Sequence, residues 1–171
     1  IDLLNSPYVR GRLDAAVSPL LEDREAMRVI ATACVLRAFS IHAGTDFIRA
    51  VTGGDPYDVL LKNEVATFEF GALTPEELAL HSATFSEFFL KEYVGGRGII
   101  SVICRLAFEA ARRKNSKDQP NSQRSREARK ALGSLVQYGR VSKLLAGTAE
   151  ASENLTSLYE ELRDNVIIND E

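Results

Sequence analysis

Apolar residues repeat at helical spacing through most of the chain, and this pattern limits the fold more than any other sequence feature. Intervals of three and four residues place apolar side chains on one face of an α-helix, which has about 3.6 residues per turn. Four segments show the pattern: residues 22–41, 99–110, 128–145 and 155–166. The segment 99–110 is so apolar that we expect it to be buried on most sides. The sequence therefore predicts a mainly α fold.

Shorter helices are expected in the first third of the chain. Residues 8–21 have helical spacing with a soft boundary at Pro19, and residues 45–51 form a second short amphipathic segment. Residues 52–56 (Thr-Gly-Gly-Asp-Pro) are typical of a turn. In that turn Asp55 is placed to cap a further helix, with proline at its first position.

Residues 64–94 contain the clearest alternation of polar and apolar residues and allow two interpretations. Residues 65–70 fit a short strand, which Gly71 is expected to break. Thr74-Pro75-Glu76-Glu77 has the pattern of a helix start, so one helix over residues 75–94 is one interpretation. The other is a second strand through Leu78 and Leu80 and a helix from Ser82.

The second interpretation is preferred because three helices followed by a β-hairpin is the order of a winged helix. The predicted fold is then a helical domain with a small, winged-helix-like β-hairpin, followed by an antiparallel helical extension. Gly95-Gly96-Arg97-Gly98 is expected to be a helix-to-helix turn. This divides the chain into a winged-helix-like unit at residues 1–96 and an extension at residues 97–171, with a basic linker at 112–125. The start at Ile1, inside an apolar pattern, suggests a piece of a longer protein.

The motifs of the common enzyme classes are missing from the sequence. Gly95–Gly98 lacks the Lys-Ser or Lys-Thr of a phosphate loop, and neither His42 nor His81 lies in a metal-binding or nucleophile motif. Cys34 and Cys104 fall on apolar helical faces and are expected to be reduced core residues of a cytosolic protein. No apolar run has the length of a membrane span. We expect no enzyme, no metal site and no membrane partner for the chain by itself.

Positive charge is concentrated in the second half of the chain, although the net charge is −3. Residues 105–143 contain eleven Lys or Arg and three Asp or Glu. Nucleic acid is an alternative partner of this region, because cations that neutralise phosphates supply most non-specific affinity. A solvated surface is favoured over nucleic-acid binding, since no aromatic residues are interleaved for base stacking. The candidate residues are Arg112, Arg113, Lys114, Lys117, Arg124, Arg126, Arg129 and Lys130.

Residues 81–93, HSATFSEFFLKEY, resemble the end of the winged-helix domain of STAND signalling NTPases, the NACHT group in particular. That family has an apolar strand ending in His, then Phe-x-Glu-Phe-Phe and a Tyr one turn later. The matching positions here are Leu80, His81, Phe85, Glu87, Phe88, Phe89 and Tyr93. The resemblance implies a nucleotide-sensing role for His81, toward the phosphate of ADP held by a preceding ATPase domain. One extra residue between His81 and Phe85 departs from the family pattern.

The resemblance implies a non-catalytic regulatory module of a larger intracellular signalling or defence NTPase, which couples nucleotide state to a sensor or partner. No cofactor is expected in this chain, and ATP or ADP would be bound by the parent protein. The expected partners are other domains of the parent, or a protein partner or oligomer, in the cytoplasm. The alternatives are a nucleic-acid-binding adaptor that uses residues 112–130 and a plain protein–protein interaction domain.

Overall fold

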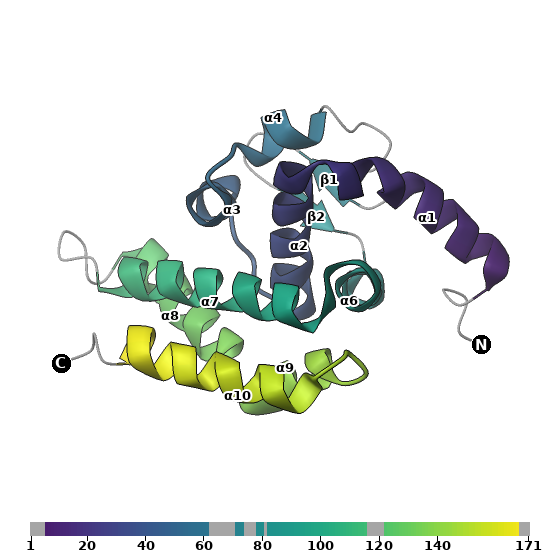
Figure 1. Ribbon diagram of the computed structural model, residues 1–171. Coiled ribbons are helices and arrows are strands. Elements are labelled where there is room, and N and C mark those ends of the chain that lie inside the picture. The colour runs from purple at the N-terminus through teal and green to yellow at the C-terminus, as the bar shows by residue number, and fades with distance from the viewer. Residues whose placement is uncertain (1–5, 62–70, 74–77, 81, 116–121, 168–171) are drawn as a thin grey trace. The chain divides into compact units, whose positions relative to one another are not determined.

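The computed structural model describes residues 6–61, 71–73, 78–80, 82–115 and 122–167, and these residues are mainly helical (Figure 1). The mainly α prediction is confirmed. The chain divides into two compact units, one formed by Ile1–Ala38 and His42–Phe89, the other by Phe39–Ile41 and Leu90–Glu171. The first unit contains α1 (Pro7–Glu22), α2 (Arg24–Ala38), α3 (Thr45–Thr52), α4 (Pro56–Leu61), β1 (Gly71–Leu73), β2 (Leu78–Leu80) and α6 (Ala83–Phe89).

Helix α2 is the centre of the first unit. Helices α1, α3, α4 and α6 and strand β2 all contact it (Figure 1). It begins at a capped end, where the Asp23 carboxylate accepts hydrogen bonds from the backbone N–H groups of Glu25 and Ala26 at 2.9 and 3.0 Å. Nine residues of α2 are buried, and eight of them follow one another in sequence: Ala26, Val29, Ile30, Ala31, Thr32, Ala33, Cys34, Val35 and Leu36. Its alanines allow neighbouring elements to approach on several sides.

One predicted turn and one predicted helix cap in the first unit are confirmed, and two helix bounds differ from the predictions. Gly53 has a left-handed backbone, φ 83°, and its N–H donates to the Arg49 carbonyl, so the predicted turn is confirmed. The Asp55 carboxylate accepts from the Tyr57 N–H at 2.9 Å and caps α4, as predicted. Helix α1, however, continues through Pro19, and α2 ends at Ala38, earlier than expected.

The described part of residues 64–94 contains two three-residue strands that pair antiparallel, with Gly71 opposite Leu80 and Leu73 opposite Leu78. Gly71 was expected to break a strand, but it begins β1. The strand expected at residues 65–70 lies outside the described residues. Because Leu78–Leu80 is extended, the single helix over residues 75–94 is wrong. Helix α6 begins after Ser82, whose hydroxyl oxygen accepts from the Phe85 N–H at 3.2 Å, and this start agrees with the preferred interpretation.

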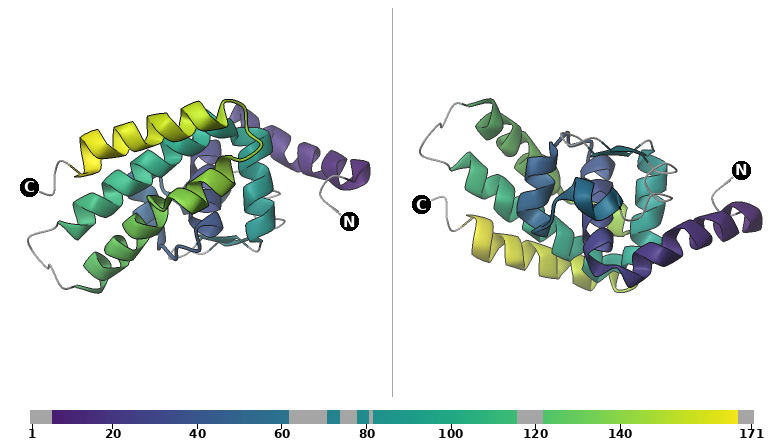
Figure 2. Two further views of the ribbon diagram at one scale, coloured as in Figure 1. Left: turned by 90° about the horizontal axis from the view of Figure 1, so that it is seen from below. Right: turned by 90° about the horizontal axis from the view of Figure 1, so that it is seen from above.

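The second unit is built around α7 (Gly95–Lys114). A π-helical turn, Leu90–Val94, leads into α7, which α8 (Gln123–Leu135) and α10 (Ala151–Leu162) contact along its length. Helix α8 returns antiparallel to α7, and α10 runs in the direction of α7 again (Figure 2). The predicted burial of residues 99–110 is confirmed, because Ile99, Ile103 and Leu106 have no exposed surface.

Two helix boundaries in the second unit differ from the predictions. Gly95–Gly98 is the first turn of α7 and not a connection between helices. The helix expected over residues 128–145 is divided into α8 and α9 (Tyr138–Leu145). At this division the Val136 carbonyl accepts a 3.0 Å hydrogen bond from the Tyr159 hydroxyl. A carbonyl group at the end of α8 thus has its hydrogen-bond donor on α10.

Candidate functional site

The predicted sensor residue His81 lies outside the described residues, but the motif around it is mostly described. Its neighbour Leu80 is buried at the end of β2. Phe85 and Phe89 are buried on α6, and their ring centroids are 6.0 Å apart. Phe88 is half-buried on the same helix. Core packing is the default expectation for these three phenylalanines, and it is confirmed for Phe85 and Phe89 but only in part for Phe88.

Both cysteines are free and buried, as the sequence predicts for core residues. Burial raises the pKa of the Cys34 thiol to about 12, although a hydrogen bond with Ser86 acts in the opposite direction. Burial also raises the pKa of Cys104 to about 12, and the hydrogen bond and negative charge of Glu161 add to this effect. A thiol with so high a pKa is a weak nucleophile at neutral pH. These two buried thiols are therefore almost entirely protonated at neutral pH.

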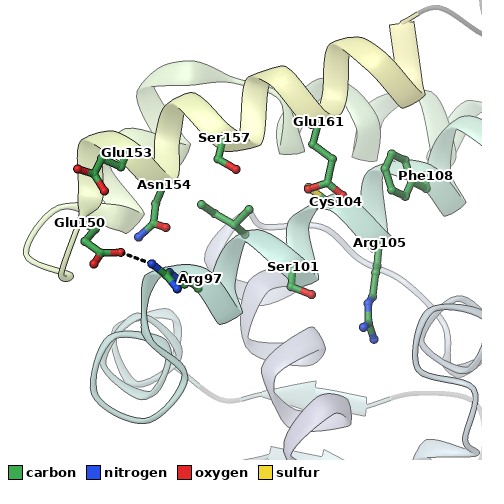
Figure 3. Close-up of a pocket in the computed structure, with 11 residues that line it drawn as sticks. Arg97, Ser101, Cys104, Arg105, Phe108, Glu150, Glu153, Asn154, Ser157 and Glu161 are labelled. Carbon is green, nitrogen blue, oxygen red and sulfur yellow. Dashed lines mark hydrogen bonds and ion pairs between the residues drawn. The ribbon is translucent and has the colours of Figure 1, made fainter.

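A groove with a volume of about 610 Å³ lies between α7 and α10 within the second unit (Figure 3). Helix α7 lines it with Arg97, Ile100, Ser101, Cys104, Arg105 and Phe108. Helix α10 and the residue before it line the opposite side with Glu150, Glu153, Asn154, Ser157 and Glu161. The α7 side of the groove thus combines apolar side chains with two arginines, and the α10 side is polar and acidic.

The polar groups of the groove make contacts within the second unit. Arg97 forms an ion pair with Glu150 at 2.9 Å across one end, and Glu161 points toward Cys104 (Figure 3). Asn154 is buried and donates from Nδ2 to the Ala149 carbonyl at 3.0 Å. No histidine lines the groove among the described residues, so its hydroxyl and thiol groups have no imidazole base there.

Sequence reasoning missed this groove because its two sides are about fifty residues apart and Gly95–Gly98 was expected to be a turn. A helical assignment of that segment would have placed Arg97, Ser101 and Cys104 on one face, since they are spaced by four and three residues. Nothing in the local sequence pairs that face with α10. The Arg97–Glu150 ion pair is set by tertiary packing alone.

The structure distributes the basic candidate residues over two helices. Arg112, Arg113 and Lys114 form the last turn of α7, while Arg124, Arg126, Arg129 and Lys130 lie on α8. Lys117 lies outside the described residues. The expected linker at 112–125 is therefore shorter than predicted, because both of its ends are helical. Positive side chains in the last turn of α7 complement the negative end of the helix dipole.

Glu109 organises the basic end of α7. Its carboxylate, 8% exposed, accepts two hydrogen bonds from Arg112 at 2.7 and 2.8 Å and one from Arg113 at 2.6 Å. Burial raises the pKa of Glu109, but the hydrogen bonds and charges of the two arginines outweigh burial and hold this pKa below its usual value. The same hydrogen bond and charge raise the pKa of Arg112.

Comparison with known protein families, with curated proteins and with solved structures finds no match to this chain. The described residues contain no group of three or more His, Cys, Asp and Glu side chains that could bind a metal ion. None of the described helices combines the length and apolar character that crossing a membrane requires.

Proposed function

We propose that the chain is a non-catalytic regulatory and interaction module, similar to the winged-helix region and adjoining helices of a STAND signalling NTPase. In this proposal the module responds to the nucleotide held by an ATPase domain of the parent protein. It passes that state to a sensor or partner, and the helices of the second unit are the connection to that partner.

The observation that carries the proposal is the packing of α6 on α2. The resemblance requires an apolar residue before His81 and two aromatic residues that anchor the following helix. Leu80, Phe85 and Phe89 are 8%, 8% and 0% exposed, so all three are core residues. The Ser82 cap fixes where α6 begins, directly after His81 in sequence. These contacts support a strand-to-helix joint that could present one polar side chain to a neighbouring domain.

The acidic character of the first unit supports a role inside a protein assembly over a role in reading DNA. Helix α4 and its cap contain Asp55 and Asp58, and Asp55 is paired with Arg49. In DNA-binding winged helices the equivalent helix usually enters the major groove. Carboxylates at that position would repel phosphates, so a winged unit of this kind would contact protein.

Two measurements test the proposal. The reading frame upstream of Ile1 is expected to encode a GxxxxGK[ST] loop, and a reading frame without such a loop would exclude it. In the full-length protein, His81→Ala is expected to lower the amount of ADP that copurifies, as measured by chromatography of the released nucleotide. His42→Ala is the matched control, because His42 is the chain's other histidine and is exposed. Equal ADP retention in both variants and the unmodified protein would contradict the sensor role.

A further inference from the structure

We propose that the end of α7 and the outer face of α8 form a surface that binds the phosphate backbone of nucleic acid, with Arg112 as its oriented contact. This basic surface consists of Arg112, Lys114, Arg124, Arg126, Arg129 and Lys130. This surface does not depend on the NTPase resemblance. It also differs from a charged linker, because every one of these residues lies on a helix.

A direct contact brings the two basic segments together. The Ser125 hydroxyl donates to the Lys114 carbonyl at 3.3 Å, and Ser125 is 1% exposed. Arg124 and Arg126 flank Ser125 in sequence, so they lie beside the last turn of α7. Helices α7 and α8 pack along their length. The positive charge is therefore concentrated at one end of a helical hairpin.

Arg112 is held in a fixed orientation while it remains accessible. Its Nε and one terminal nitrogen donate to the two oxygens of Glu109, yet its side chain is 72% exposed. Among the described residues no further acceptor contacts this guanidinium, so its other N–H groups face solvent. A guanidinium of this geometry suits phosphate oxygens, and its prior fixation reduces the entropy lost on binding.

Helix α8 extends the surface with a line of cations. Arg126, Arg129 and Lys130 are exposed and follow the spacing i, i+3, i+4, opposite the face on which Ala128 and Ala131 are buried. The acidic side chain of this helix, Glu127, accepts a 2.8 Å hydrogen bond from Gln123. Cations spaced by about one helical turn, roughly 5 Å, match a ligand whose negative charges also repeat regularly.

The surroundings of the basic surface favour nucleic acid over a lipid membrane. Helices that lie on membranes insert large apolar side chains beside their cations. The large apolar residues that are exposed in the described chain are Tyr8, Leu21 and Tyr138, and none belongs to the basic surface. The absence of an aromatic residue among its members also predicts contact with the backbone and not with stacked bases.

Fluorescence anisotropy with labelled RNA and DNA duplexes of about 20 base pairs tests the proposal on the complete chain. If about four phosphates are neutralised, the Kd should rise about 100-fold between roughly 50 and 200 mM salt. Arg112→Gln should weaken binding and reduce the slope of log K against log salt by about one. Arg126→Gln with Lys130→Gln should reduce that slope by about two.

The matched control is Arg28→Gln, which removes the same charge from an exposed position on α2 outside the basic surface and the groove. Its affinity should stay within about twofold of the unmodified chain. Equal losses for Arg28→Gln and Arg112→Gln would overturn the proposal, as would the lack of salt-sensitive binding. Vesicles with anionic phosphatidylserine, or polyglutamate, serve as competitors. Binding to either as tight as to the duplexes would also overturn it, because the surface would then recognise negative charge in general.

Discussion

A Cβ atom on Gly96 would lie 2.5 Å from the Nδ2 atom of Asn154, so the first turn of α7 touches α10 at a position where only glycine fits. The same atom would lie 3.0 Å from the Thr148 hydroxyl oxygen and 3.2 Å from the Ala149 carbonyl oxygen. These three neighbours belong to the end of the α9–α10 connection and to α10. The Asn154 side chain is itself fixed by its hydrogen bond to Ala149.

Gly96→Ala is therefore expected to lower the free energy of unfolding by about 1–3 kcal/mol, through overpacking. The measurement is equilibrium unfolding in urea, followed by circular dichroism. Gly133→Ala is the matched control, because a Cβ at this position in α8 meets no atom within 4 Å. It should stabilise the protein by about 0.5–1 kcal/mol through helix propensity. Opposite signs for the two variants are the expected result, and equal effects would contradict the packing argument.

Arg140→Ala is expected to destabilise the second unit. The Arg140 Nη1 donates a 2.8 Å hydrogen bond to the carbonyl of Phe39, a residue that is 2% exposed. Loss of the donor would leave this carbonyl without its partner, which costs about 1–3 kcal/mol. Lys143→Ala, at an exposed position on the same helix, should change the urea midpoint little. Similar losses in both variants would show that the hydrogen bond is not important for stability.

Glu109→Gln tests the ion pairs at the end of α7 through their pH dependence. Because the pKa of folded Glu109 lies below its ordinary value of 4.5, the carboxylate stabilises the fold above about pH 4.5. This contribution disappears as the pH falls through the lower pKa of the folded state. The variant should thus be less stable than the unmodified protein by about 1–3 kcal/mol at pH 7. The difference should shrink below pH 4.5 and can be followed by urea unfolding at several pH values. A difference that does not change with pH would contradict this explanation.

The two cysteines are expected to react slowly with thiol reagents in the folded protein. With a pKa of about 12 for both thiols, roughly one molecule in ten thousand carries a thiolate at pH 8. Alkylation with iodoacetamide, followed by mass spectrometry, should accelerate sharply only when urea unfolds the chain. Cys34→Ala and Cys104→Ala separate the two sites. Fast modification of Cys104 without urea would show that the α7–α10 groove opens to expose it.

Local sequence signals predicted the starts of α4 and α6 and the burial of α7. Asp55 and Ser82 cap their helices through hydrogen bonds between near neighbours, so sequence spacing is enough to identify them. The apolar spacing of residues 99–110 likewise predicted a helix that is buried on most sides. These features depend on interactions within a few residues or on the burial of one whole face.

Features set by distant packing were not predictable from the sequence. Gly95–Gly98 has the composition of a turn, but contacts with α10 favour a helical first turn of α7. At the division between α8 and α9, the Val136 carbonyl similarly has a distant partner, the Tyr159 hydroxyl. For the basic surface, the positive charge of the segment was the reason that Arg112 was predicted as a candidate. The ion pair of Arg112 with Glu109 has a local sequence signal, the i, i+3 spacing of an acidic and a basic residue.

The three residues Phe39–Ile41 belong to the second unit, although residues of the first unit precede and follow them in the chain. During synthesis these residues leave the ribosome long before α7–α10 exist. The Phe39 carbonyl has no hydrogen bond from Arg140 until that residue has been synthesised. The loop that this hydrogen bond closes spans 101 residues. A fragment that begins at Leu90 would contain every helix of the second unit and still lack Phe39, a buried residue of that unit. The two units therefore cannot be separated by cutting the chain at one place, and a truncation designed at the 89/90 boundary should yield a less stable product than its helix content suggests.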